Sequence, residues 1–460
     1  MRVLIPALLV LALVAAGCSW AKTASAPLRP PKMPAPREPE PGVRVLVTVV
    51  DGDTHQLVRR GLVRIGDHAD RLGSRGLAEL QIRHPAPLPV TVWARGYAAR
   101  TVRMPFQRDR TATIRVYRPS LQWPLYGATP ARTQTQSAIH LRPPFRVVWS
   151  RGIGSLIEFP AVVSDGLAYI GNFKGAVRAI SMRNGKIAWR TDLDSKMAAS
   201  PAVSGDELVV HGMDGVVTVL DRRNGRVLWR YRIGSPIESS PIVHDGVDYF
   251  GAWNGVVYAL DLHRRRLRWS YVSGYKITSS AALSGGNAYI GDYGGRLLVL
   301  RQSDGSLRWS ASVNGRIYGT PAVAAGRVFV PSSDGDSLTA FSTSGRYLWR
   351  VGTGSYVYSS PAVWAGRVFF GSYNGLLYCV SAATGQVGWT VGAGGPISGA
   401  PVVVDGVVYA GSFAHRIVGA DARSGRVLFT FPHGEYVPVS GNGGRLLLHG
   451  YSRLYAVEPA

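Results

Sequence analysis

Apolar and polar residues alternate in short runs along most of this 460-residue chain, and turn-forming residues separate the runs. Near the N-terminus, Val45, Val47 and Val49 alternate with neighbours of other character, and Val90 and Val92 begin a later run of the same kind. Alternation with a period of two is the pattern of a strand that buries one face. The 55 glycines and 29 prolines also favour turns over helices. The pattern predicts an all-β protein.

From Trp149 onward the pattern repeats with a period of 40 residues. An aromatic residue marks the same position in each repeat: Trp149, Trp189, Trp229, Trp269, Trp309, Trp349, Trp389 and Phe429. Glycine stands four residues before most of them, as at Gly185 and Gly225. A repeat near this length with four short strands is typical of a propeller blade. We expect each large ring to cover the joint between neighbouring blades, and the glycine to let the chain pass close beneath it.

The number of repeats predicts the architecture. Seven complete repeats extend over residues 150–430, and an eighth begins at Phe431 but lacks its outer strand. Residues 146–149 precede the first repeat and can supply that strand. Closing the ring with strands from both ends removes an open sheet edge. We therefore predict an eight-bladed β-propeller over residues 119–460.

Residues 43–118 predict a separate small β-sandwich, because turn residues separate several alternating runs. Asp51 and Asp53 stand in one such turn, and we interpret them as a hairpin turn because no further carboxylates gather there for calcium. Residues 50–54, 76–78 and 96–97 resemble the carboxypeptidase-regulatory, transthyretin-like sandwich, an immunoglobulin-like architecture. The resemblance implies a spacer or adhesion module.

Residues 1–42 predict an export signal and a tether. Arg2 is followed by fifteen mainly apolar residues, too few to span a bilayer but suited to an export signal. Residues 14–18 resemble a bacterial lipobox, which implies a signal over residues 1–18 and a lipid anchor on Cys18. An ordinary signal peptide with an incidental cysteine is the alternative. Residues 19–42 contain seven prolines and predict an extended tether, so we expect an exported protein anchored on the extracytoplasmic side of a bacterial membrane.

The chain is strongly basic, with 52 Lys and Arg against 28 Asp and Glu and a net charge of +24. Such a surplus attracts polyanions, but no Lys/Arg run or nucleic-acid motif is present. We predict a solvated basic surface and no nucleic-acid partner, with a dedicated polyanion site as the alternative. Two cysteines exclude a disulfide framework, and the ten histidines lack ligand spacing, so no metal site is predicted.

The repeats carry the motif Ala-x-Asp…Thr-Gly-x-x-x-Trp, closely matched at residues 259–269, 221–229 and 384–389. They resemble PQQ-repeat propellers, a family of quinone-dependent dehydrogenases and non-catalytic scaffolds. The dehydrogenases usually carry a vicinal cysteine pair, which this chain lacks, and Cys379 takes a small core position of the repeat. Together with the lipobox, the repeats resemble BamB-type lipoproteins, which assist outer-membrane protein insertion. We predict a protein without enzymatic activity or cofactor.

The candidate binding residues surround the mouth of the central channel. Strand order places the loop into each inner strand and the turn between the second and third strands at the same end of the ring. The residues there are Glu158, Phe173, Lys196, Glu238, Trp253, Lys276, Tyr293, Arg316, Tyr318, Tyr356, Tyr358, Tyr373, Phe413 and Tyr436. Aromatic and arginine side chains dominate binding interfaces. The alternative is that the aromatics are packing residues of the repeat.

The functional hypothesis is a lipid-anchored scaffold that binds the membrane surface through its anchor and a protein partner in envelope assembly. A second hypothesis is capture of an anionic glycan or small molecule at the mouth through Lys196, Lys276 and Arg316. A third is a quinone-dependent dehydrogenase, for which the chain lacks the expected cysteine pair.

Overall fold

The computed structural model describes residues 43–82, 86–106 and 111–460. Nearly all regular structure in these residues is strand, and the one helix among them is the 3-10 turn η1 (Pro119–Leu121). These residues contain no helix with the length and apolar character needed to cross a membrane. The prediction of an all-β protein is confirmed. The predicted signal, Cys18 and the tether of residues 1–42 lie outside the described residues.

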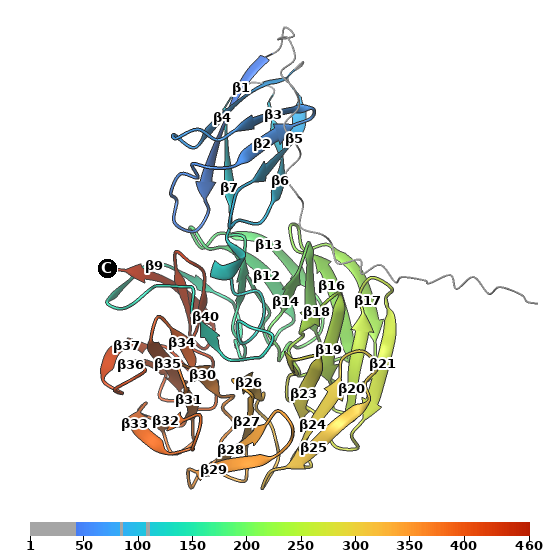
Figure 1. Ribbon diagram of the computed structural model, residues 1–460, viewed down its shortest axis with the longest axis vertical. Coiled ribbons are helices and arrows are strands. Elements are labelled where there is room, and N and C mark those ends of the chain that lie inside the picture. The colour runs from blue at the N-terminus through green and yellow to red at the C-terminus, as the bar shows by residue number, and fades with distance from the viewer. Residues whose placement is uncertain (1–42, 83–85, 107–110) are drawn as a thin grey trace, which may run out of the picture.

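The N-terminal part is a small domain of two sheets that stands on one side of a large ring of sheets (Figure 1). Its strands are β1 (Val43–Asp51), β2 (Leu62–Ile65), β3 (His68–Arg71), β4 (Leu77–Ile82), β5 (Pro87–Trp93), β6 (Arg100–Pro105) and β7 (Thr111–Val116). The sheet orders are β4-β1-β7 and β3-β2-β5-β6, with β1 and β7 parallel. Val45, Val47 and Val49 are fully buried in a core shared by both sheets. The alternation of apolar and polar residues in the sequence therefore identified the face of β1 that packs into the core.

The ring consists of successive four-stranded antiparallel sheets, which we call blades. The first blade comprises β10 (Val162–Ser164), β11 (Leu167–Ile170), β12 (Ala176–Ser181) and β13 (Ile187–Asp192), and the second comprises β14 (Ala202–Ser204), β15 (Glu207–His211), β16 (Val216–Asp221) and β17 (Val227–Arg232). The third comprises β18 (Val243–His244), β19 (Val247–Gly251), β20 (Val256–Asp261) and β21 (Arg266–Val272). The next comprises β22 (Ala282–Ser284), β23 (Asn287–Gly291), β24 (Arg296–Arg301) and β25 (Leu307–Ser312). Each of these blades uses four consecutive strands of the chain, as the repeat predicts.

The remaining blades continue the same order around the ring. One comprises β26 (Ala322–Ala324), β27 (Arg327–Ser332), β28 (Ser337–Ser342) and β29 (Tyr347–Gly352), and the next comprises β30 (Ala362–Trp364), β31 (Arg367–Gly371), β32 (Leu376–Ser381) and β33 (Val387–Gly392). The blade after these comprises β34 (Val402–Val404), β35 (Val407–Ser412), β36 (Arg416–Asp421) and β37 (Val427–Pro432), with β8 (Thr135–Gln136) added beside β34. The last sheet comprises β38 (Val439–Gly441), β39 (Leu446–His449) and β40 (Arg453–Pro459) together with β9 (Phe145–Gly152). The middle strands are buried on both faces, as in β16, whereas outer strands such as β13 alternate between buried and exposed residues. This difference arises because neighbouring blades cover both faces of the middle strands.

The last of these sheets joins strands from distant parts of the chain. β9 pairs antiparallel with β40, and Trp149 lies opposite Ala456. Glu458 forms ion pairs with Arg146 on β9 and with Arg445. The sequence analysis expected residues 146–149 to supply a strand to the last blade. β9 contains these residues, and it pairs with the edge of β40 that would otherwise be open.

The repeated tryptophans link neighbouring blades. The indole Nε1 of Trp189 donates to the carbonyl oxygen of Arg222 in the next blade at 2.9 Å, and Trp149 and Trp269 make the same bond to Met182 and Gln302. A Cβ added to Gly225 would lie 2.5 Å from the Trp189 ring, which is too close for a side chain. Gly225 stands four residues before Trp229, the aromatic of its own repeat, and it must lack a side chain because the Trp189 ring of the preceding blade packs against it. This agrees with the sequence prediction.

A segment ahead of the first repeat lies against the inner strands at the centre of the ring. We call residues 122–136 the channel segment. Its backbone bonds in turn to the inner strands of successive blades: Trp123 to Val163, Pro124 to Val203, Pro130 to Leu283, Ala131 to Val323, Thr133 to Val363 and Gln134 to Val403. The sequence analysis placed these residues in the propeller domain without assigning them a role.

Arg132 fixes the channel segment in place. Its guanidinium, which is 1% exposed, donates to the carbonyl oxygens of Ala281 at 2.9 Å and Ser240 at 3.0 Å, and also to that of Tyr126. Burial lowers the pKa of Arg132 to about 10, so the group stays charged at neutral pH. The carbonyl oxygens that surround it compensate for the lost hydration.

The N-terminal domain docks on the ring through the turn that contains Asp51 and Asp53. The Asp51 carboxylate accepts the backbone N–H groups of Asp53 and Thr54, so it forms the turn that the sequence predicted. Asp53 reaches across the joint and accepts the side-chain amides of Gln122 and Asn442, each at 2.8 Å. Burial raises the pKa of Asp53 to about 7, although the hydrogen bond from Gln122 opposes the shift.

Asp53 should make the stability of the protein depend on pH. Its carboxyl binds a proton in the folded protein up to about pH 7, whereas in the unfolded chain it loses that proton near pH 4. The folded state therefore holds more protons between these values, and the contribution of Asp53 to the free energy of unfolding falls as pH rises through this window. We expect the melting temperature to fall less from pH 5 to pH 8 in Asp53→Asn than in the unchanged protein. Equal pH profiles would contradict this assignment.

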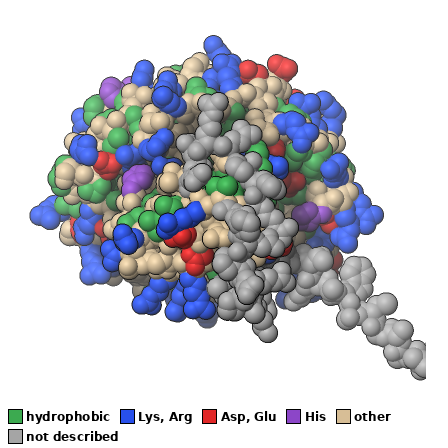
Figure 2. Space-filling view, turned by 90° about the horizontal axis from the view of Figure 1, so that it is seen from above, with side chains coloured by type: hydrophobic (Ala, Val, Ile, Leu, Met, Phe, Trp, Pro, Cys, Tyr) green, Lys and Arg blue, Asp and Glu red, His purple; other side chains and the backbone are tan. Residues whose placement is uncertain are grey.

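Basic side chains are spread over the face seen in Figure 2, with acidic and apolar side chains between them. Several of the arginines are paired with carboxylates, such as Arg223 with Asp206 and Arg190 with Asp192. On that face the positive charge forms no single stripe of the kind that follows a nucleic-acid backbone.

Candidate functional site

The predicted mouth residues lie together at one end of the ring. Backbone hydrogen bonds join the turn between the second and third strands to the loop that enters the inner strand in each of several blades. Examples are Trp253 N–H to the Pro236 carbonyl at 3.0 Å and Tyr293 N–H to the Lys276 carbonyl at 2.9 Å. The N-terminal domain contacts turns at the opposite end, including those of Gly166 and Asn442. The mouth therefore faces away from the N-terminal domain.

Five of the predicted residues share one cavity of about 50 Å³ at the centre of the mouth: Glu158, Glu238, Tyr318, Tyr358 and Tyr436. Tyr126 of the channel segment lines the same cavity and is 2% exposed. Thr278 also lines it, and its buried hydroxyl has no hydrogen-bond partner in the described part of the chain. The position of Thr278 at the mouth follows from the 40-residue spacing, whereas the sequence analysis did not include Tyr126 among the candidates.

The two carboxylates of this cavity have different surroundings. Glu238 is 8% exposed and accepts the Tyr318 hydroxyl at 2.7 Å and the Trp253 indole N–H at 2.9 Å. Glu158 lies 3.5 Å from the same Tyr318 hydroxyl, whose proton is directed to the nearer Glu238. Glu158 is therefore the carboxylate with the weaker hydrogen bonding.

The surroundings of Glu158 change the protonation of its carboxyl group. Burial, and after it the charge of Glu238, raises the pKa of Glu158 to about 7. Burial and the two carboxylates also raise the pKa of Tyr318 far above its usual range, so this hydroxyl remains a donor at all physiological pH values. A positive charge placed in the cavity would reverse the effect on Glu158 and favour its ionised form.

Aromatic rings form an arc along one side of the mouth. Tyr318 and Tyr358 have ring centroids 5.3 Å apart, and the contacts continue from Tyr358 to Tyr373 at 5.1 Å, to Phe413 at 5.7 Å and to Tyr436 at 5.7 Å. Tyr356 contacts Tyr358 and Tyr373 and is 48% exposed. These rings therefore pack against one another, and Tyr356 also presents an aromatic surface to solvent; their role in binding stays a prediction.

The predicted basic residues lie on the other side of the mouth and are already engaged. The Lys276 ammonium is 3.4 Å from the centroid of the Trp253 ring and 5.0 Å from that of Tyr293. Lys196 lies 5.3 Å from the Phe173 ring, and Arg316 pairs with Asp334 at 2.9 Å. Cation–π contacts and this ion pair hold the three cations outside the central cavity, which leaves the cavity itself acidic.

The cavity does not fit a quinone cofactor. A volume of about 50 Å³ accommodates a few water molecules or one small polar group, far less than a fused-ring quinone. Glu158 and Glu238 would also repel acidic groups on such a cofactor. Within residues 43–82, 86–106 and 111–460 no group of three or more His, Cys, Asp or Glu side chains is arranged to hold a metal ion. Cys379 is 2% exposed, as expected for a core residue.

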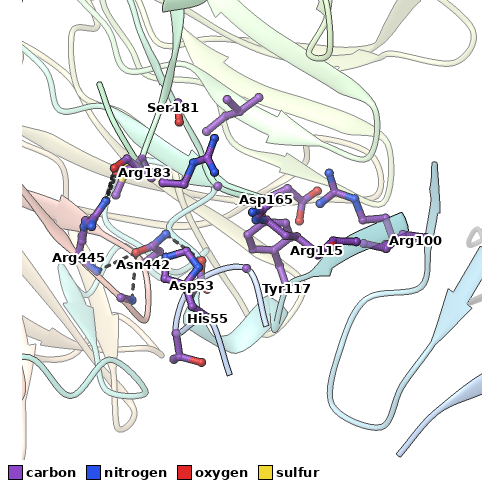
Figure 3. A pocket seen from close by; sticks show the side chains of 18 of the residues that line it. Asp53, His55, Arg100, Arg115, Tyr117, Asp165, Ser181, Arg183, Asn442 and Arg445 are labelled. Carbon is purple, nitrogen blue, oxygen red and sulfur yellow. Dashed lines mark hydrogen bonds between the residues drawn. The ribbon is translucent and has the colours of Figure 1, made fainter. Parts of the chain in front are cut away.

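Sequence reasoning also missed a second hollow, at the joint between the N-terminal domain and the ring. It has a volume of about 640 Å³ and is lined from both parts of the molecule, by residues that include Arg100, Arg115, Tyr117 and Arg183 (Figure 3). No repeat or motif indicates it, because its walls come from segments that are unrelated in sequence.

Comparison with known proteins supports the fold and a family. A family model described as outer membrane protein assembly factor BamB matches residues 173–280, 253–357 and 336–459, together more than half of the chain. No curated protein matches the sequence.

Solved structures with the same fold come from different functional classes. BamB from Moraxella catarrhalis is 18% identical with a TM-score of 0.59, over 69% of this chain and 98% of that one. The computationally designed Ika8 protein is also 18% identical with a TM-score of 0.61, over 67% and 97% of the two chains. Quinohemoprotein alcohol dehydrogenase from Comamonas testosteroni is 14% identical with a TM-score of 0.64, over 73% and 80%. At these identities the similarity establishes a shared propeller fold and leaves activity open.

Proposed function

The chain belongs to the family described as outer membrane protein assembly factor BamB, and on that premise we propose that it is a non-catalytic scaffold for protein–protein interaction in the cell envelope. In this proposal Cys18 carries a lipid anchor, residues 19–42 form a tether, residues 43–118 form a transthyretin-like sandwich and the ring is an eight-bladed propeller. The observation that carries the proposal is the acidic, aromatic cavity at the mouth of the ring.

The N-terminal domain is suited to act as a spacer. β1 begins at Val43, directly after the proposed tether, and the chain reaches the ring at Asp53. Nine residues of strand span roughly 30 Å. An anchor attached through the tether would therefore hold the ring away from the membrane, with its mouth on the side opposite the N-terminal domain. This orientation leaves the mouth accessible to a partner.

The cavity favours a basic side chain of that partner. A guanidinium or ammonium group matches the cavity in size and would supply donors to Glu158 and to the unpaired hydroxyl of Thr278. Tyr358 and Tyr436 would present aromatic rings to the cation. The acidity of the cavity argues against an anionic glycan at this position, and its size argues against a quinone.

Replacing Glu158 with glutamine should reduce partner binding at least tenfold, because the variant removes the carboxylate with the weaker internal hydrogen bonding. Binding to the unchanged protein should also strengthen as pH rises through about 7, as Glu158 becomes ionised. The measurement is a crosslinked pull-down of tagged protein from its own membranes, with and without competing arginine amide. Glu207→Gln, on a strand that begins at the opposite end of the ring, is the control.

A defined partner that is lost in Glu158→Gln and retained in Glu207→Gln would support the proposal. Equal capture by both variants would move the interface away from the cavity. The absence of any specific partner for the unchanged protein would contradict the scaffold function itself.

A further inference from the structure

The hollow between the N-terminal domain and the ring has the size of a small-molecule site, about 640 Å³. We call it the joint groove. One wall carries Arg100 at the start of β6 and Arg115 near the end of β7, and the other carries Arg183 in the turn between β12 and β13. Figure 3 shows these three side chains on either side of Asp165.

The walls of the joint groove are held in a fixed relation. The Tyr117 ring fits between glycines of both parts: a Cβ on Gly52 would lie 2.2 Å from the ring, and one on Gly166 would lie 2.4 Å from the hydroxyl oxygen. The bonds of Asp53 to Gln122 and Asn442 join the same two parts. The groove is therefore formed before any ligand binds, which reduces the entropic cost of binding.

The acidic residues that line the groove are already satisfied by groups of the protein. Asp165 pairs with Arg222 at 2.6 Å, and Glu458 pairs with both Arg146 and Arg445. Arg445 also donates to the carbonyl oxygens of Met182 at 2.9 Å and Arg183 at 2.6 Å, which fixes the turn that carries Arg183. These pairings leave Arg100, Arg115 and Arg183 without a carboxylate partner among the acidic residues of the groove.

Those remaining arginines have donors to spare. Arg100, Arg115 and Arg183 make no ion pair with a carboxylate in the described part of the chain. Arg100 Nη1 and Arg115 Nε are shielded from solvent and have no hydrogen-bond partner there. The Arg100 guanidinium lies 5.0 Å from the Tyr117 ring centroid, which orients it along the wall. Two partly buried guanidinium groups with unpaired N–H donors, together with the exposed Arg183, give the groove a basic lining that favours an anion.

We propose that the joint groove binds a phosphate ester of small-molecule size through Arg100, Arg115 and Arg183. Guanidinium groups match phosphate oxygens with paired donors, and the three of them outweigh the charge of about −2 on a phosphate monoester. The phosphate could come from a soluble sugar or polyol phosphate or from a lipid headgroup. The groove lies at the ring end of the N-terminal domain, about the length of β1 from Val43, which favours the soluble source over the anchoring membrane.

The test is titration calorimetry of the full-length protein in a neutral detergent, with sn-glycerol 3-phosphate as the probe and glycerol as the uncharged control. We expect saturable binding of glycerol 3-phosphate only, at least fivefold weaker in Arg183→Gln and weakened by added salt. Arg183 is exposed, so this variant should keep the melting temperature of the unchanged protein. Arg226→Gln, an exposed arginine on another blade, is the matched control and should bind normally.

Three results would overturn the proposal in whole or in part. No saturable heat with glycerol 3-phosphate would remove the site, and an equal loss in Arg183→Gln and Arg226→Gln would reduce it to general electrostatics. Binding confined to phosphatidylglycerol vesicles and lost in Arg183→Gln would overturn the soluble source. None of these results bears on Glu158 or on partner binding at the mouth, so this inference is tested separately from the proposed function.

Discussion

Replacing Asp248 with alanine is expected to lower the free energy of unfolding by about 3–5 kcal/mol, because it would leave the buried His211 ring without its carboxylate partner and open a cavity beside it. Asp248 and His211 are both fully buried, and the His211 Nε2 lies 2.8 Å from the Asp248 carboxylate. His211 Nδ1 lies 2.6 Å from the carbonyl oxygen of Ser239. Both ring nitrogens of His211 are thus held by oxygen atoms of the protein, so the pair is fixed in the core.

The variant Asp248→Asn separates charge from shape. Asparagine can still accept the Ile242 N–H that Asp248 accepts at 3.1 Å, and its amide can donate to a neutral His211. We expect Asp248→Asn to cost about 1–2 kcal/mol, clearly less than alanine. Urea unfolding of both variants followed by tryptophan fluorescence gives the comparison. Equal costs for the two variants would contradict this expectation and would show that the charge of Asp248 accounts for the whole loss, whereas no cost for asparagine would show that only the shape and hydrogen bonds of the side chain matter.

Removing the ring of Trp189 is the other change with a large expected effect. Trp189→Ala should lower the free energy of unfolding by about 3–5 kcal/mol, because it deletes a large side chain, 8% exposed, from the joint between two blades. The variant also removes the hydrogen bond to the Arg222 carbonyl. Trp189→Phe should cost about half as much, since it keeps a ring against Gly225.

The control for Trp189 is an aromatic residue outside the joint. Tyr347 is 55% exposed at the start of the outer strand β29, and Tyr347→Ala should change the free energy of unfolding by less than about 1 kcal/mol. Both variants can be compared by urea unfolding at one pH. If Trp189→Ala cost no more than Tyr347→Ala, the repeated aromatics would not be the link between blades.

The repeat made the ring predictable because each blade depends mainly on its neighbours. A period of 40 residues fixes the four strands of a blade, and the aromatic at the end of each period fixes how it packs on the next. The same order fixes which loops share an end, and for this reason the mouth residues were identified from their spacing. Glu158, Glu238 and Tyr318 follow one another at intervals of 80 residues, which is two repeats, yet only the closed ring brings them into one cavity.

Departures from the repeat carried information that the sequence analysis did not use. Asp248 stands where other repeats have Ala168, Ala288 or Val328, all fully buried in the core. A charged residue at a position that is otherwise apolar indicates a specific buried partner. The identity of that partner, His211, follows only from the structure, because the two residues belong to adjacent blades.

The sequence by itself determined the class of fold, the strands and the end of the ring where the candidate residues gather, because these depend on local periodicity and on the strict order of neighbouring strands. The tertiary structure alone decided that residues 122–136 bind along the inner strands, that Arg132 anchors them and that a groove forms beside Asp53. These features join segments far apart in the chain through single side-chain contacts. No period links such segments, so their pairing depends on the geometry of the closed ring and of the domain docked on it.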